Sequence, residues 1–171
     1  DDGNANQGEK VNQTGGHDPL RPGLMTSPRL IFGLPFGAGV VLHVMTGANI
    51  EPGEHLLAVM LGGVLVAIGL VLAAWATIAL RRGGQHPDPA RPTTALVTDG
   101  PYQYTRNPIY VSFASIGLGI GLILNSYWVL GSVTIAVLGL HFLVVLREER
   151  YLETVIDHAY AGYRENVRRW L

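Results

Sequence analysis

The stretch LLAVMLGGVLVAIGLVLAAWATIAL, residues 56–80, contains no Asp, Glu, Lys or Arg. A helix needs about 20 consecutive, mostly apolar residues to cross a bilayer. A surface helix of a soluble protein would present a polar face about every 3.6 residues, and the runs 56–61 and 64–68 present none. Residues 56–80 therefore predict a transmembrane helix.

Charge-free sequence continues on both sides of this helix. No charged residue lies between Arg29 and Glu51, and none lies between Arg106 and Arg147. The second stretch is too long for one span and Asn125-Ser126 divides it, so we expect a tight helical hairpin there. The predicted fold class is all-α, an integral membrane bundle of four transmembrane helices with a cytoplasmic C-terminal helical segment. The four spans are expected at about 30–49, 56–80, 108–124 and 127–146.

The averages over the 171 residues agree with this interpretation. Charged residues make up 15% of the chain, below the ~25% that is usual in globular proteins. The net charge of −1 argues against a general nucleic-acid binder. The absence of cysteine excludes a disulfide framework, a thiolate metal site and a Cys nucleophile. A soluble helical bundle with a very apolar core is the alternative, which the uneven distribution of charge disfavours.

All 12 Lys and Arg residues fall on one side of the four-span arrangement. They lie before the first span, in 81–107 and after 146, whereas the other side carries Glu51 and Glu54. Because cytoplasmic loops retain Lys and Arg, we expect both termini and the 81–107 loop in the cytoplasm. Residues 1–28 are polar and are expected to form a flexible tail before the membrane domain, 29–171.

Small residues are spaced for close helix packing. Gly33 and Gly37 are four residues apart, as are Gly117 and Gly121, with Gly119 between them. This spacing lets the backbones of membrane helices approach each other, so we expect these glycines at helix interfaces.

Two histidines, His43 and His141, lie inside the expected spans. An ionisable residue in a membrane is a functional hypothesis by default. We favour neutral side chains that bond to a neighbouring helix, and we find no third ligand for a metal site. The roles of both, and of His86 in the following loop, stay open.

The start of the third expected span places an arginine at the membrane surface. Pro108 suits the first turn of a helix, and Asn107 suits its N-cap. Arg106 then lies beside the positive end of that helix, where an anion such as a carboxylate or phosphate is favoured.

Two acids, Glu148 and Glu149, leave the fourth span at the same depth as this arginine. Apolar residues continue at helical spacing behind them, which predicts a helix to about 158. The two acids are either solvated charges at a helix exit or groups that bind a ligand.

These motifs resemble a known family. The segment LVTDGPY at 96–102, the segment RNPIY at 106–110, a hydrophobic hairpin and the pair at 148–149 resemble the integral-membrane S-adenosylmethionine-dependent methyltransferases. That family includes isoprenylcysteine carboxyl methyltransferase and the membrane phospholipid methyltransferases. Its pattern is Arg-His-Pro-x-Tyr, a hydrophobic stretch and Glu-Glu. The tail at 160–170 is similar to the family's Tyr-x-x-Tyr segment before a basic stretch.

One position departs from the family pattern, because Asn107 stands where the family has histidine. Asparagine keeps a hydrogen-bonding amide but cannot titrate. We therefore assign Asn107 to cofactor positioning or helix capping and not to base catalysis.

The resemblance implies transfer of a methyl group from S-adenosylmethionine to a lipophilic or small acceptor, such as an isoprenylcysteine carboxylate, a phospholipid amine or a thiol. It implies membrane lipids as partners, no nucleic acid, no metal and a bacterial inner membrane location. The implied catalytic residues are Arg106, Glu148 and Glu149. Leu96 and Val97 are expected to line the adenine pocket, and Arg168 and Arg169 to meet anionic lipid. The implied cofactor-binding residues are Leu96, Val97, Gly100, Tyr102, Tyr104, Arg106, Asn107, Pro108, Tyr110, Glu148, Glu149, Tyr163 and Arg164.

Two alternatives stay open. NADPH-dependent sterol-reductase-like membrane enzymes share an Arg-x-Pro-x-Tyr-like element, a hydrophobic hairpin and a Tyr-rich C-terminus, but they are generally longer and have more spans. A non-catalytic membrane protein could also keep this fold. The Glu-Glu pair and four spans favour methyl transfer. The acceptor and the oligomeric state are not readable from the sequence.

Overall fold

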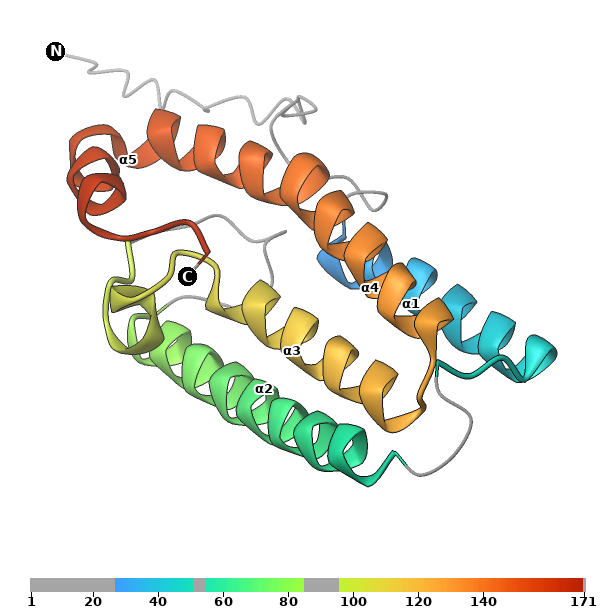
Figure 1. Cartoon of the computed structure of the whole chain (residues 1–171). Coiled ribbons are helices and arrows are strands. Elements are labelled where there is room, and N and C mark those ends of the chain that lie inside the picture. Colours follow the sequence, from blue (N-terminus) through green and yellow to red (C-terminus); the bar gives the residue numbers. More distant parts are fainter. Residues whose placement is uncertain (1–26, 51–54, 85–95, 171) are drawn as a thin grey trace, which may run out of the picture.

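The computed structural model describes residues 27–50, 55–84 and 96–170, with the backbone only for 155–159. The described residues contain helices and no β-strand, which confirms the all-α prediction. The tail to residue 26 and the loop at 85–95, which includes His86, lie outside them. The elements in Figure 1 are α1 (Pro28–Thr46), α2 (Leu56–Arg82), the 3-10 turn η2 (Gly100–Gln103), α3 (Pro108–Ile123), α4 (Tyr127–Leu140), the π-helical turn η3 (His141–Val145) and α5 (Leu146–Asn166).

Three helical segments of the described residues are long and apolar enough to cross a membrane. They are Pro28–Thr46, Leu56–Arg82 and Tyr127–Thr154, the last running through α4 and η3 into α5. The fourth expected span, α3, is apolar but has 16 residues, which rise about 24 Å against a hydrocarbon thickness of about 30 Å. Three of the four expected spans therefore meet the length of a spanning helix.

Close backbone contact joins α2 to α3, which lie alongside each other in Figure 1. A Cβ atom added at Gly119 would lie 2.6 Å from the carbonyl oxygen of Gly62. Gly117 and Gly121 are similarly crowded by side chains of α4, which confirms their predicted packing role.

Among the described residues, the same prediction is wrong for Gly33 and Gly37. A Cβ atom at either position would meet none of their atoms within 4 Å. These two glycines lie on an open face of α1, because α1 packs against α4 through another side that contains Gly39.

The predicted hairpin between α3 and α4 turns at Asn125-Ser126. Asn125 has a φ of 51°, a left-handed conformation that asparagine tolerates better than most residues. The Ser126 hydroxyl accepts from the Val129 N–H at 3.2 Å and so caps the start of α4. The polar pair thus ends one helix and begins the next, as expected.

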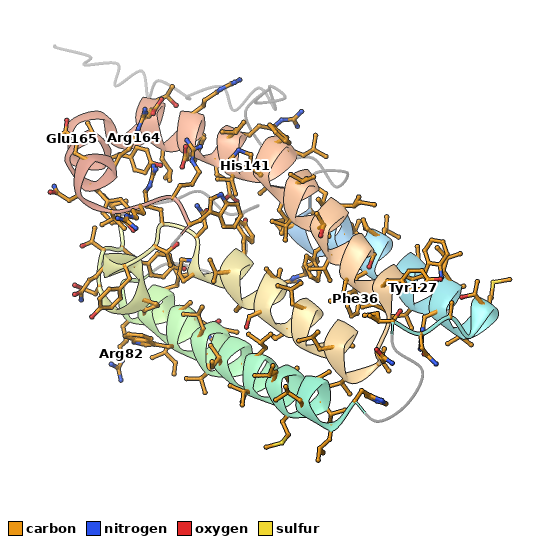
Figure 2. All side chains as sticks on the ribbon, in the orientation of Figure 1. Phe36, Arg82, Tyr127, His141, Arg164 and Glu165 are labelled. Atoms are coloured by element: carbon orange, nitrogen blue, oxygen red, sulfur yellow. The ribbon has the colours of Figure 1, made fainter. Side chains whose placement is uncertain are left out.

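The polar end of the bundle lies where α2 ends, α3 begins and α4 passes into α5 (Figure 1). Figure 2 shows Arg82, Arg164 and Glu165 at this end and Tyr127 at the opposite end. A hydrophobic core lies beneath this end and consists of Tyr110, Leu140, Val144 and Val145, with Trp170 packed against them. Helix α5 runs to Asn166, beyond the expected 158, and so carries the C-terminal residues to the α2–α3 connection.

Candidate functional site

The connection that leads into α3 is held against the end of α2. Gly100 has a φ of +63°, and a Cβ atom there would lie 3.1 Å from the Trp75 Nε1 atom, so both its conformation and its surroundings favour glycine. Pro108 then occupies the first turn of α3 and is fully buried. These local contacts fix where Arg106, two residues before Pro108, enters the bundle.

Asn107 occupies the predicted N-cap position, but its side chain does not cap the helix. Its main-chain oxygen accepts from the N–H groups of Tyr110 and Val111 at 3.1 and 3.0 Å. The side-chain Nδ2 atom instead donates to the Arg169 carbonyl oxygen at 2.9 Å. The amide that the sequence assigns to cofactor positioning or helix capping therefore binds the backbone of Arg169.

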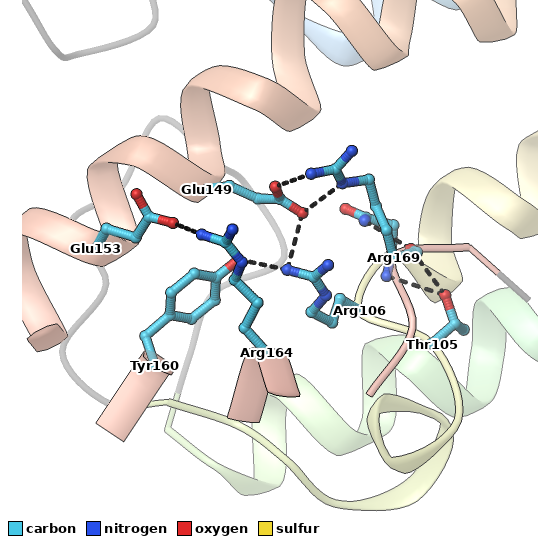
Figure 3. A network of polar contacts seen from close by, with 8 residues as sticks. Thr105, Arg106, Glu149, Glu153, Tyr160, Arg164 and Arg169 are labelled. Carbon is cyan, nitrogen blue, oxygen red and sulfur yellow. Dashed lines mark hydrogen bonds and ion pairs between the residues drawn. The ribbon is translucent and has the colours of Figure 1, made fainter. Parts of the chain in front are cut away.

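Two arginines converge on one buried glutamate, Glu149, whose side chain is 10% exposed (Figure 3). Arg106 Nη1 lies 3.0 Å from Glu149 Oε1 and donates to the Tyr160 hydroxyl at 3.2 Å. Arg169 binds Glu149 with both arms, from Nε to Oε1 at 2.9 Å and from Nη2 to Oε2 at 2.8 Å. We call Arg106, Glu149, Tyr160 and Arg169 the ionic cluster. Its two guanidinium groups exceed its single carboxylate by one positive charge.

The neighbouring acid, Glu148, faces a different partner. The Tyr110 hydroxyl of α3 donates to Glu148 Oε1 at 2.9 Å. Successive residues of an α-helix point about 100° apart, so the two glutamate side chains contact different parts of the molecule. Glu148 faces α3, and Glu149 faces the connection before it.

Two tyrosines, Tyr102 and Tyr163, lie at the edge of the ionic cluster. The Tyr163 hydroxyl donates to the Tyr102 carbonyl oxygen at 2.6 Å. Burial raises the pKa of Tyr163 to about 12 and also raises the pKa of Tyr102 and of Tyr160, because burial disfavours the charged phenolate. These hydroxyls therefore stay protonated at neutral pH. The hydrogen bonds to Glu149 raise the pKa of the Arg169 guanidinium.

Residues 167–170, which we call the C-terminal strap, lie along the α2–α3 connection. The Arg106 N–H donates to the Arg168 carbonyl oxygen at 2.9 Å, and Thr105 forms a parallel bridge with Arg168. The Thr105 hydroxyl donates to the Arg169 carbonyl oxygen at 3.2 Å. Trp170 packs with its ring centroid 6.0 Å from that of His141. The strap thus joins the connection to the ionic cluster.

The structure brings together most of the predicted polar residues and leaves others aside. Tyr104 is 68% exposed and faces Trp75. The exposed Arg164 side chain pairs with Glu153. Val97 packs against the end of α2. The predicted residues that lie in or beside the ionic cluster are Tyr102, Arg106, Asn107, Tyr110, Glu148, Glu149 and Tyr163.

The sequence prediction of the site did not include Tyr160 and Arg169 of the ionic cluster, nor Thr105, which binds the strap. The guanidinium of Arg169, which the sequence assigns to anionic lipid, binds Glu149 in the structure. The only sequence signal was a basic run near two acids, and such a run does not say which charges pair. His43 and His141 each have a buried Nδ1 atom without a hydrogen-bond partner in the described part of the chain.

The described residues form a helical bundle that has three helices long and apolar enough to cross a membrane and a polar site at one end. More particularly, the chain belongs to the phospholipid methyltransferase family, whose model matches residues 57–158, more than half of the chain. Comparison with curated proteins and with solved structures gave no match. The family implies methyltransferase activity, and the matched region includes Arg106 and the Glu-Glu pair but ends before Tyr160 and the strap.

Proposed function

We propose that this chain is a membrane methyltransferase that takes its methyl group from S-adenosylmethionine and gives it to a lipophilic acceptor. The ionic cluster, together with Tyr110 and Glu148, is the proposed donor site. The observation that carries the proposal is the convergence of Arg106 with the Glu-Glu pair of α5, inside the region that the family matches.

The residues of the cluster fit the chemistry of this donor. The buried Nε atom of Arg106 has no hydrogen-bond partner among the described residues, and a buried donor left without an acceptor is costly. The amino-acid carboxylate of S-adenosylmethionine is an acceptor that a guanidinium binds well. The excess positive charge of the cluster favours the same group, and Glu148 can accept from ribose hydroxyls or balance the cationic centres of the donor.

Bound S-adenosylmethionine supplies a methyl group on a sulfonium, ready for direct displacement by a nucleophile. The protein has to align the two substrates and keep water away. Arg106 holds the donor's carboxylate. The Tyr110 hydroxyl holds the Glu148 side chain in its orientation. The Asn107 amide is engaged by the Arg169 carbonyl, so its role is positioning and not proton transfer.

We further propose that α3 is the fourth span and that the polar end of the bundle faces the cytoplasm. The distribution of all 12 Lys and Arg residues supports this orientation. The position of α3 between α2 and α4 supports the span, because neighbours on both sides can shield a helix that is short for the bilayer. A water-soluble donor then arrives from the cytoplasm, and a lipophilic acceptor arrives laterally from the bilayer.

Donor binding tests the proposal directly. The full chain in detergent is expected to bind S-adenosylmethionine and its demethylated product in a calorimetric titration. Arg106→Ala should weaken binding by about 1.5–3 kcal/mol, because a hydrogen bond to a charged group is lost. Arg82→Ala is the matched control, since Arg82 is exposed at the end of α2. Binding of NADPH in place of the donor, or equal losses in both variants, would overturn the proposal.

Methyl transfer identifies the acceptor and the orientation in one assay. Vesicles that contain the full chain are given labelled donor, with isoprenylcysteine, phospholipid amine or thiol acceptors in separate arms. Inside-out vesicles should label the acceptor when the donor is added outside, and right-side-out vesicles should not. The reverse result would place the polar end on the other side of the membrane.

A further inference from the structure

The C-terminal strap makes contacts that neither the sequence motifs nor the family match assign. It lies beyond residue 158, where the match ends. Two of its carbonyl oxygens accept from the α2–α3 connection: that of Arg168 from the Arg106 N–H, and that of Arg169 from Thr105 and Asn107. The strap therefore binds the residues on both sides of Arg106 as well as Arg106 itself.

The side chain of Arg169 has a geometry distinct from that of Arg106. It binds both oxygens of Glu149, at 2.9 and 2.8 Å, whereas Arg106 reaches Oε1 alone, at 3.0 Å. A bidentate guanidinium fixes the plane of the carboxylate, and a single contact leaves that plane free to turn. The orientation of Glu149 toward Arg106 thus depends on Arg169.

Exposure separates the two arginines as well. The side chain of Arg169 is 34% exposed, and that of Arg106 is 9% exposed. Arg169 lies on the solvent side of Glu149, and Arg106 lies on the inner side. The outer arginine is therefore placed to hold the carboxylate, while the inner one is placed to meet a buried ligand.

We propose that Arg169 is a positioning residue of the donor site and that Asn107 holds it in place by docking the strap. Arg169 acts through Glu149, which in turn orients Arg106 for the donor's carboxylate. This inference rests on the proposed function, because it assigns a role in donor binding. It also gives Asn107 a defined task, since its Nδ2 group supplies a hydrogen bond that a carboxylate at the same position could not supply.

The first test measures donor affinity in a double-mutant cycle on the full chain. Arg169→Gln is expected to raise the Kd of S-adenosylmethionine about tenfold, and Arg169→Lys to restore part of the loss, because lysine keeps the charge but not the fork. In the Glu149→Gln background, Arg169→Gln should have little further effect, since residues that act through one contact are not additive. Arg150→Gln, on an exposed side chain of α5, should leave the Kd unchanged.

The second test reads strap docking without any ligand. Hydrogen exchange of the peptide that contains the Arg106 amide should be slow in the wild-type chain and faster in Asn107→Asp, because that amide donates to the strap. Thermal unfolding midpoints of all variants identify any that fail to fold. Arg169→Lys and Asn107→Asp keep size and shape close to the original, so they carry the test if Arg169→Gln unfolds.

The possible outcomes separate this inference from the proposed function. If the wild-type chain does not bind the donor, the proposed function fails and this inference fails with it. If the wild-type chain binds the donor but Arg169→Gln and Arg169→Lys bind equally well, only this inference fails. It also fails if the Arg169→Gln loss is the same with and without Glu149, or if Asn107→Asp leaves the Arg106 amide protected.

Discussion

Replacing Glu149 by glutamine should destabilise the folded protein far more than the same change four residues later. The Glu149 carboxylate is bound by two guanidinium groups, at 3.0 Å from Arg106 and at 2.9 and 2.8 Å from Arg169. Glutamine keeps one carbonyl oxygen but adds an NH2 group that faces a guanidinium. The substitution therefore leaves two positive charges close together without the negative charge between them.

The magnitude follows from the burial of the three groups. Removing one partner of a buried ion pair costs about 3–5 kcal/mol. Arg106 and Glu149 are 9% and 10% exposed, but Arg169 is 34% exposed, so solvent screens part of its interaction. We expect a loss of about 2–3 kcal/mol in the free energy of unfolding. For a chain of this length each kcal/mol lowers Tm by about 2–4 °C, which gives a decrease of about 4–12 °C.

The assay is thermal unfolding of the full chain in detergent, followed by tryptophan fluorescence. Glu153→Gln is the matched control on the same helix, because Glu153 also pairs with an arginine, Arg164, but the two side chains are 42% and 53% exposed. Exposed pairs contribute about 0–1 kcal/mol, so that variant should change Tm by no more than ~4 °C. Equal decreases in the two variants would refute the reasoning, since the cluster would then be no more than a surface ion pair.

Two further predictions concern helix packing and alkaline stability. Gly119→Ala should lower the free energy of unfolding by about 1–3 kcal/mol, because its Cβ atom would lie 2.6 Å from a backbone oxygen that cannot rotate away. Gly33→Ala is the control, since its Cβ atom would meet no such contact. Equal thermal midpoints for the two variants would contradict this prediction. Burial raises the pKa of Tyr163 from 10.0 to about 12, so its contribution to stability is complete below pH 10 and is lost as the pH rises through 12. Tyr163→Phe should therefore lose less stability than the wild-type chain between pH 10 and 12 in a series of thermal unfolding curves, and parallel curves would contradict the shift.

Much of the fold was predictable because a bilayer-spanning helix is specified by one continuous stretch of sequence. The span expected at 56–80 is the helix Leu56–Arg82, and the turn expected at Asn125-Ser126 lies where α3 gives way to α4. The sequence was a weaker guide to which glycines pack against another helix. Gly117 and Gly33 each have a second glycine four residues later, but among the described residues only Gly117 packs against another helix. That difference depends on which sides of the helices pack together.

The candidate site shows the same division between local and distant causes. The backbone position of Asn107 follows from the proline after it, and the sequence predicts it. The partner of its side chain lies 62 residues away, and Arg169 reaches Glu149 across 20 residues. A charged side chain pairs with whichever opposite charge the fold brings close, so a basic run at a chain end reads equally well as a lipid contact or as half of an ion pair. Burial favours the ion pair over the lipid contact. Glu149 is 7% exposed as a residue, so leaving its charge unpaired would be too costly. The fold supplies the two guanidinium groups that the local sequence could not specify.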